Sequence, residues 1–336
     1  MEKFNAGMVV HIYNPSHDEA LAINKAQYCP SSAARQTGEM FWDVAKWWMS
    51  PDDFILHLPA DGSLRGVAVP DWTMVQRIEP WGWDRHIVGV LRRLGAPDRL
   101  LPTDVQLDTI RQLSSRQTAV RVLEALRLRL PLSETIPASA VLQAESRWCT
   151  LESEVTEAVE TFGGEAMLKQ PWSCSGRGVW RTTAADLSGE HSSSILRVRK
   201  TLREQGAVEV EPLYECVADF AMEFCAEADG SVRYEGLSVF ATHAGGGYAG
   251  NVIAPQPELQ RRLEEKAGGV LPLQALAEVL CSVLGEVLAG QYAGPLGVDM
   301  MHTPEGIHPC IEVNLRNTMG RVAIFQQQFS PTGNRN

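Results

Sequence analysis

The sequence lacks the long apolar run that a membrane-spanning helix requires. Across its 336 residues, no stretch approaches the roughly 18 consecutive apolar residues of such a helix. The first residues, MEKFNAGMVV, do not place a basic segment before an apolar one, as a secretory signal does. We therefore expect a cytoplasmic protein without a membrane partner.

Basic residues are also scarce. The chain has 30 Lys and Arg against 41 Asp and Glu, a formal net charge of −11. Nucleic acids and anionic membranes attract basic surfaces, so neither is expected as a main partner. Small anionic substrates would need local cations or a bound metal. The sequence does not indicate an oligomeric state.

Cysteine pairs at the spacing of metal or redox sites are absent. The seven cysteines are scattered and form no Cys-x-x-Cys motif. An odd number without such spacing predicts reduced, mostly buried thiols. With 44% apolar residues, the chain has the composition of a globular protein long enough for two or three subdomains.

The most informative stretch that is present covers residues 295 to 320. Two β-like runs, 296 to 301 and 308 to 315, flank Glu305-Gly306, a pair that can close a tight hairpin. Antiparallel partners share a face of the sheet. The resulting core face would consist of three opposed pairs: Leu296 with Leu315, Val298 with Val313, and Met300 with Ile311.

The other face of this hairpin is acidic. It would place Asp299 opposite Glu312, while Gly297 leaves room opposite Asn314. Opposed like charges destabilise a sheet unless something neutralises them. Carboxylate and amide oxygens suit Mg²⁺ or Mn²⁺, so the hairpin predicts a metal site at Asp299, Glu312 and Asn314. A solvated polar face is the alternative.

A polar turn follows the first strand of the chain. Residues 9 to 13 have a buried-strand pattern that leads into Asn14-Pro15-Ser16-His17-Asp18. Ligands bind at the carboxyl ends of strands in open α/β sheets, so Asn14, His17 and Asp18 are candidate substrate residues. Alternatively, Ser16 and Asp18 cap the following helix and His17 is structural.

Helical and strand patterns fill the rest of the chain. In the first 115 residues we expect a helix from Ala33 to Met49, with Phe41, Ala45 and Trp48 on one stripe, a strand at 54 to 58, and helices at 84 to 94 and 105 to 113. Further on, the patterns predict helices at 116 to 130, 151 to 162 and 272 to 288, and strands at 208 to 211, 219 to 226 and 232 to 242. A glycine-rich loop, 245 to 251, could close over a ligand or be a plain surface loop.

A lysine at a strand end is followed by a loop of small residues. Lys169 ends the strand that begins near Ala166, and residues 173 to 179 contain serines and glycines. Such loops let backbone N–H groups approach phosphate oxygens, and the lysine adds a point charge. The order differs from a Walker A loop, in which the lysine follows the glycines. An ordinary hairpin turn with an exposed lysine is the alternative.

In order, the chain offers a lysine strand with its small-residue loop, a strand bearing Glu209 and Glu211, and the GVD…IEVNLR hairpin. This succession resembles the ATP-grasp superfamily, in particular its carboxylate–amine ligases, over about residues 116 to 325. The resemblance implies an α/β (α+β) fold. A small N-terminal α/β domain, 1–115, would precede an ATP-grasp domain, 116–336, with subdomains at about 116–205 and 206–336.

The resemblance also implies roles for individual residues. Lys169 and Arg116 would contact ATP phosphates, and Arg316, which follows the metal ligands, would act with Lys169 in catalysis. Further ATP contacts would come from the loop, the adenine hinge and a ribose-binding acid: Ser173, Ser175, Gly176, Gly178, Glu209, Val210, Glu211 and Asp219. Two departures stand out, because Pro212 lies where the family often has lysine and no residues that recognise known substrates have a counterpart.

The activity implied is that of an ATP- and Mg²⁺-dependent ligase. It would activate a small-molecule carboxylate as an acyl phosphate and join it to an amine or similar nucleophile. A small-molecule kinase on the same fold and a nucleotide-binding module without chemistry are the alternatives. We expect the acceptor to bind between the domains, against the turn at 14 to 18 and the loop at 245 to 251.

Overall fold

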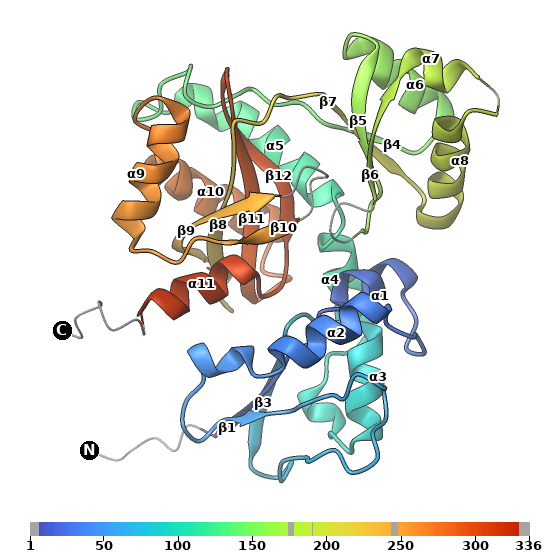
Figure 1. Cartoon of the computed structure of the whole chain (residues 1–336), viewed down its shortest axis with the longest axis vertical. Helices are drawn as coiled ribbons and strands as arrows, with labels where there is room; N and C mark the ends of the chain where they lie inside the picture. The colour runs from blue at the N-terminus through green and yellow to red at the C-terminus, as the bar shows by residue number, and fades with distance from the viewer. Residues whose placement is uncertain (1–6, 174–177, 190, 243–247, 329–336) are drawn as a thin grey trace.

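The computed structural model describes residues 7–173, 178–189, 191–242 and 248–328. These segments form three β-sheets, each with its own helices (Figure 1). The sheet nearest the N-terminus lies at the bottom of Figure 1, the five-stranded sheet at the upper left and the four-stranded sheet at the upper right. Within the described segments, each helix is too short or too polar to cross a bilayer.

The first sheet is parallel, with strand order β2-β1-β3. Its elements are β1 (Met8–Ile12), α1 (His17–Ile23), α2 (Ser32–Phe41), β2 (Phe54–Ile55), β3 (Val75–Pro80), α3 (Arg85–Arg93) and α4 (Asp104–Leu113). Val10 of β1 and Ile87 and Leu91 of α3 are buried together, as expected for a parallel sheet covered by helices.

Three sequence predictions for this region were wrong or incomplete. The helix predicted from Ala33 to Met49 ends at Phe41, and a 3₁₀ turn (Val44–Trp47) follows. The chain turns there and Val44 packs beside Tyr13 and Trp81. A continued helix would not bring Val44 into this cluster. The strand predicted at 54 to 58 shortens to two residues. Strand β3 was missed, since consecutive exposed residues break its alternation.

The four-stranded sheet is antiparallel, in the order β4-β7-β5-β6. Its elements are β4 (Arg147–Cys149), α6 (Glu152–Thr161), β5 (Glu165–Lys169), β6 (Val179–Thr183), α7 (Ala184–Ser188), α8 (Ser193–Gln205) and β7 (Val208–Pro212). Leu168 and Val210 lie in its core with Val155 and Val198 of the helices. The opposite face of this sheet carries Lys169 and Glu211.

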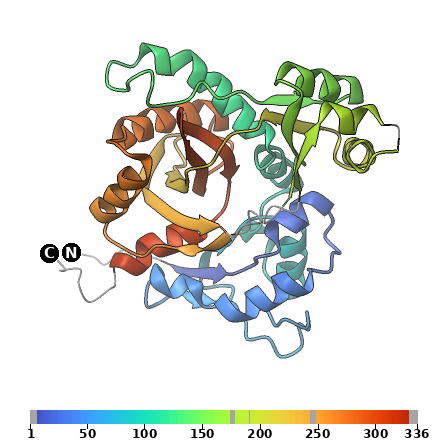
Figure 2. The same ribbon diagram turned by 45° about the horizontal axis from the view of Figure 1, so that its top comes forward.

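The five-stranded sheet has the order β10-β9-β8-β11-β12 and is antiparallel. Its elements are α5 (Gln117–Arg129), β8 (Ala218–Ala226), β9 (Val232–Thr242), β10 (Tyr248–Asn251), α9 (Gln256–Ala267), α10 (Leu273–Leu288), β11 (Gly294–Thr303), β12 (Gly306–Asn314) and α11 (Met319–Gln328). Helices α5, α9 and α10 lie on its outer side, and α11 lies between it and the first sheet (Figure 2).

The core of this region lies between the sheet and the outer helices. Phe220, Met222 and Phe224 of β8 are fully buried there. The predicted apolar stripe of α10 is confirmed, since all five of its leucines are buried: Leu273, Leu276, Leu280, Leu284 and Leu288. Because strand residues alternate between faces, Ala221 and Glu223 of β8 lie on the inner face.

The β11–β12 hairpin confirms part of the predicted register. Gly297 pairs with Asn314, and Asp299 with Glu312. The turn is Pro304-Glu305, however, and a register shift after Asp299 leaves β12 with two extra residues. Pro309 lies in that stretch and has no N–H to donate to a ladder.

The shift changes the predicted core pairs beyond it. Met300 and Ile311 do not pair, and Ile311 is half-buried and faces a cleft. Leu315 lies beyond the end of β12, although it is buried.

The prediction of mostly buried cysteines is also wrong. Among the six described, two are buried, two are half-buried, and Cys29 and Cys216 are exposed.

Candidate active site

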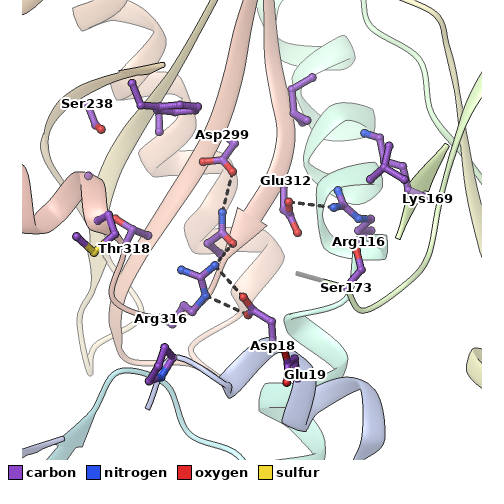
Figure 3. Close-up of a pocket in the computed structure, with 18 of the residues that line it drawn as sticks. Asp18, Glu19, Arg116, Lys169, Ser173, Ser238, Asp299, Glu312, Arg316 and Thr318 are labelled. Carbon is purple, nitrogen blue, oxygen red and sulfur yellow. Dashed lines mark hydrogen bonds and ion pairs between the residues drawn. The ribbon is translucent and has the colours of Figure 1, made fainter. Parts of the chain in front are cut away.

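One cleft of about 830 Å³ lies where the three sheets meet (Figure 3). Its walls come from α1 and α2 of the first region, from β5 to β7, from the inner face of the five-stranded sheet, and from the start of α11. Each of the three regions thus supplies side chains to the same space.

The predicted metal residues converge on this cleft. Asn314 Nδ2 donates to Asp299 Oδ2 at 3.0 Å, and Arg116 Nη2 lies 3.0 Å from Glu312 Oε2. Burial, with the nearby charge of Glu312, raises the pKa of Asp299 to about 7. Two opposed acids that resist ionising together make a donor set that a divalent cation would stabilise.

These side chains fit a hard divalent cation by their chemistry. Within the described residues, no group of three or more His, Cys, Asp or Glu side chains is arranged for a metal, and here the third donor is an amide. The Oδ1 atom of Asn314 accepts a hydrogen bond from Arg316 Nη2 at 2.9 Å. To coordinate a cation through Oδ1, Asn314 would therefore have to give up its hydrogen bond with Arg316.

Lys169 is buried rather than exposed, which removes the alternative of a surface lysine. Its Nζ lies 2.6 Å from Glu211 Oε1 and 4.0 Å from Glu209 Oε1. Strands β5 and β7 are neighbours, and Lys169 pairs with Glu209 in the sheet. Burial raises the pKa of Glu209 against the opposing effect of Lys169, and Glu211 raises it further. The predicted hinge therefore presents two acids to the lysine.

Arg116 precedes α5 and joins two walls of the cleft. Its backbone N donates to Pro171 O at 3.1 Å, in the segment after β5, while its guanidinium pairs with Glu312 of β12. Burial lowers the pKa of Arg116, but Glu312 and other nearby acids raise it above its usual value. Arg116 is thus held as a buried cation between the lysine strand and the predicted metal residues.

Arg316 forms a two-point ion pair with the first region. Its Nε and Nη2 each donate to one carboxylate oxygen of Asp18 at 3.0 Å (Figure 3). Burial alone would raise the pKa of Asp18, but Arg316 lowers it below its usual value. A continuous series of bonds thus runs from Asp18 through Arg316 and Asn314 to Asp299.

Asn14 and His17, two of the predicted substrate residues, have partners within the first region. Asn14 Nδ2 donates to Gly82 O at 2.9 Å and to Asp84 Oδ2 at 3.1 Å. His17 Nδ1 lies 3.1 Å from the same Asp84 oxygen, and the other oxygen of Asp84 caps α3 at Ile87. Both side chains are buried and fix the turn, and of the three candidates only Asp18 lines the main cleft.

The remaining predicted residues are distributed as follows. Ser173 lines the cleft, whereas Val210 is buried in the core of its sheet. Asp219, the second residue of β8, pairs with Met301 and does not line the cleft, and Cys216 Sγ donates to it at 3.3 Å.

The two glycine-containing loops are described only in part. Gly178 packs so closely on Ser173 that a side chain would clash. Ser175 and Gly176 lie outside the described residues, as do Gly245 to Gly247. The end of the predicted 245–251 loop, Tyr248–Asn251, is the edge strand β10, because it pairs with β9.

Sequence reasoning missed a polar group at the inner face of β8 and β9. Thr318 Oγ1 donates to Glu223 Oε2 at 2.7 Å, and Asn251 Nδ2 donates to Ser238 Oγ at 2.6 Å. All four residues line the cleft. Burial raises the pKa of Glu223 to about 8, with a further contribution from Asp299. An available signal was that Glu223 interrupts the apolar run from residue 220 to 226.

The structure resembles solved structures of synthetases. It matches D-alanyl-alanine synthetase A from Vibrio cholerae O1 biovar eltor str. N16961 with a TM-score of 0.52 and 14% identity, over 98% of this chain and 94% of that one. It matches D-cycloserine synthetase DcsG with a TM-score of 0.51 and 10% identity, over 95% and 98%. For N5-carboxyaminoimidazole synthetase from Staphylococcus aureus complexed with ADP, the TM-score is 0.50 and the identity 11%, over 95% and 73%. No protein-family model and no curated protein matches the sequence.

Proposed function

We propose that this chain, which has the ATP-grasp fold and the α/β class predicted from its sequence, is an ATP- and Mg²⁺-dependent ligase that joins a small-molecule carboxylate to a nitrogen nucleophile. One observation carries the proposal. A single cleft holds a buried lysine, two opposed acids with an amide beside them, and an arginine tied to the first region. As part of the proposal, residues 1–115 form the first domain, and the ATP-grasp subdomains divide near residue 205.

The nucleotide would lie against the four-stranded sheet. Lys169 and Arg116 supply positive charge on that side, and Ser173 begins the loop that would cover the phosphates. Glu209 and Glu211 hold the ammonium of Lys169 in place and would release it to phosphate oxygens, a stronger anionic partner. The solved structure of S. aureus N5-carboxyaminoimidazole synthetase contains ADP, which supports a nucleotide in a fold of this shape.

Asp299, Glu312 and Asn314 would hold Mg²⁺, which would neutralise phosphate charge when bound. The protein's own residues then have two tasks. Lys169 binds the terminal phosphate, so that the substrate carboxylate can approach it without charge repulsion. Arg316, oriented by Asp18, lies beside the same acids and would bind the acyl oxygen as negative charge develops on it.

Two balanced steps follow from this arrangement. A carboxylate oxygen attacks the γ-phosphorus, the bond to the bridging oxygen breaks, and ADP leaves with the electron pair. The nitrogen then attacks the acyl carbon, the bond from that carbon to the phosphate oxygen breaks, inorganic phosphate leaves, and the nitrogen loses a proton. Walls from the three regions would exclude water from the acyl phosphate during both steps.

A screen for ADP release over pools of carboxylates and amines, with mass spectrometry of the products, tests the proposal. A condensed product that requires ATP supports a ligase. A phosphorylated substrate without condensation would identify the kinase alternative, and ATP binding without turnover would identify a binding module. Lys169→Ala should abolish the product, whereas Lys46→Ala, at an exposed position outside the cleft, should not.

A further inference from the structure

Glu223 is an acid buried in the cleft, and its position follows from the strand register. Gly297 of β11 pairs with Asn314 on one side and with Glu223 on the other. Glu223 therefore lies two strands away from Asn314, across a residue that has no side chain. A Cβ atom at Gly297 would come within 2.9 Å of Glu223 Oε2, so the glycine leaves the space that the carboxyl group fills.

This end of the cleft lies away from the predicted nucleotide side. In the sheet order β10-β9-β8-β11-β12, Glu312, which pairs with Arg116, belongs to β12, and Glu223 belongs to β8. Figure 3 shows Lys169 and Arg116 on one side of Asp299 and Glu312, and Ser238 and Thr318 on the other. A group bound at Glu223 would therefore face the predicted metal residues from the side opposite the nucleotide.

The carboxyl group of Glu223 has neutral partners in the described part of the protein. Thr318 donates a hydroxyl hydrogen bond to it, and no lysine, arginine or histidine of the described segments lies within ion-pair distance. Arg316, which contributes a favourable charge, is paired with Asp18 instead. At 1% exposure, an unpaired carboxylate is costly, and the raised pKa of Glu223 reflects this. A cation bound beside Glu223 would favour its ionised form.

Small neutral groups surround the carboxyl group of Glu223. A Cβ atom at Gly320 would clash with Glu223 Oε1 and lie 2.5 Å from Ser238 Oγ, so the two side chains approach one position. Asn251 donates to Ser238 and extends the polar surface toward the cleft. The space suits a compact group with several hydrogen-bond donors and one positive charge.

We propose that Glu223, with Ser238 and Asn251, binds the ammonium group of the nitrogen substrate. This inference rests on the proposed ligase function and adds the form in which the nitrogen enters and the residue that recognises it. An ammonium group supplies this positive charge and the donors together. Bound there, the nitrogen would approach the acyl group from the side away from ADP, so that nucleotide and nitrogen do not compete for the same space. Recognition is the role assigned to Glu223. Because an ammonium group has no lone pair, the nitrogen must lose one proton to solvent before it attacks the acyl carbon, and the departing inorganic phosphate takes the second proton.

Two small nitrogen nucleophiles of different charge test this role. Ammonium chloride supplies the cation, and hydroxylamine is uncharged at neutral pH. Each is titrated with ATP, Mg²⁺ and a pool of amino acids and simple carboxylic acids, and amides and hydroxamates are measured by mass spectrometry. Glu223→Gln should raise the KM for ammonium roughly ten- to a hundredfold, the usual cost of losing a charged hydrogen bond. The KM values for hydroxylamine and ATP should stay within about threefold of wild type.

Two further variants serve as controls. Glu227→Gln makes the same change at a half-exposed side chain just beyond β8, outside the cleft, and should alter none of the three KM values. Glu223→Asp keeps the charge on a shorter side chain. It should raise the KM for ammonium less than Glu223→Gln does, and it decides the question if the glutamine variant does not fold.

The outcomes separate this inference from the function on which it rests. If the wild-type protein forms neither product with ATP, the ligase proposal fails and this inference falls with it. If wild type forms both products but Glu223→Gln and Glu223→Asp leave the KM for ammonium unchanged, only the inference is overturned. Equal losses with ammonium and hydroxylamine, a raised KM for the carboxylate pool alone, or a raised Mg²⁺ requirement would likewise overturn it, because each places Glu223 against another group.

Discussion

Replacing Asp299 by asparagine should stabilise the metal-free protein and remove its response to Mg²⁺. Asp299 and Glu312 are direct partners across the hairpin, and burial together with that charge raises the pKa of Asp299 from 3.8 to about 7. A difference of about 3 in pKa corresponds to roughly 4 kcal/mol against folding at pH 7 and above. Because Asp299 borders a solvent-filled cleft, we expect Asp299→Asn to recover about half of this, or about 2 kcal/mol.

The effect should depend on pH in a defined direction. The pKa of Asp299 is higher in the folded chain than in the unfolded chain, so between about pH 4 and pH 7 the folded chain holds the extra proton. The contribution of Asp299 to stability therefore becomes more unfavourable as the pH rises through this window. Asp299→Asn should gain little near pH 4 and most at pH 8.

Thermal unfolding at pH 5 and pH 8, each with EDTA or with MgCl₂, measures both effects. At pH 8 in EDTA the variant should melt a few degrees above wild type. Mg²⁺ should raise the melting temperature of wild type and not that of the variant. Asp52→Asn, at an exposed position of the first region, is the matched control and should behave as wild type. A variant that melts at or below wild type at pH 8 in EDTA, or that Mg²⁺ stabilises as well as wild type, would refute the reasoning.

Three further substitutions test other parts of the site. Lys169→Ala should weaken binding of a non-hydrolysable ATP analogue by a few kcal/mol, because it removes a charged partner and leaves Glu211 unpaired; calorimetry showing wild-type affinity would contradict this. His17→Ala should lower the free energy of unfolding by about 1–3 kcal/mol, since Asp84 loses a buried partner, with no change in affinity for the analogue; normal stability with impaired acceptor use would restore the substrate role. Gly320→Ala should lower the melting temperature and raise the KM for ammonium, because its methyl group would crowd Glu223; unchanged values of both would argue against the close packing.

The hairpin that carries the predicted metal residues was predictable where local chemistry decided it. Apolar residues at alternate positions assign Val298 and Val313 to the core, and this places Asp299 and Glu312 together on the other face. The register shift was not predictable in detail, because Pro309 indicates a break in the ladder but not its length. The predicted pairing of Asp299 with Glu312 is therefore confirmed, although the predicted turn was wrong.

Contacts between distant parts of the chain could not be predicted from the sequence. Arg316 and Asp18 are 298 positions apart, and neither residue type specifies the other as its partner. Asn14 and His17 looked like ligand residues because a polar strand end is a common binding position, yet Asp84, the residue that caps α3, contacts both. Periodicity reports which face of an element is buried, whereas long-range polar pairs depend on how elements pack.

The placement of Arg116 has a mechanical consequence. Its backbone is fixed to Pro171 beside the four-stranded sheet, and its side chain is fixed to Glu312 of the five-stranded sheet. One residue therefore links the two sheets directly and sets the distance between them, in place of the longer loops that connect them. A motion that separates these sheets must lengthen or break the contacts of Arg116. Substitution of Arg116 should therefore alter how widely the cleft opens, and not only the charge that it presents.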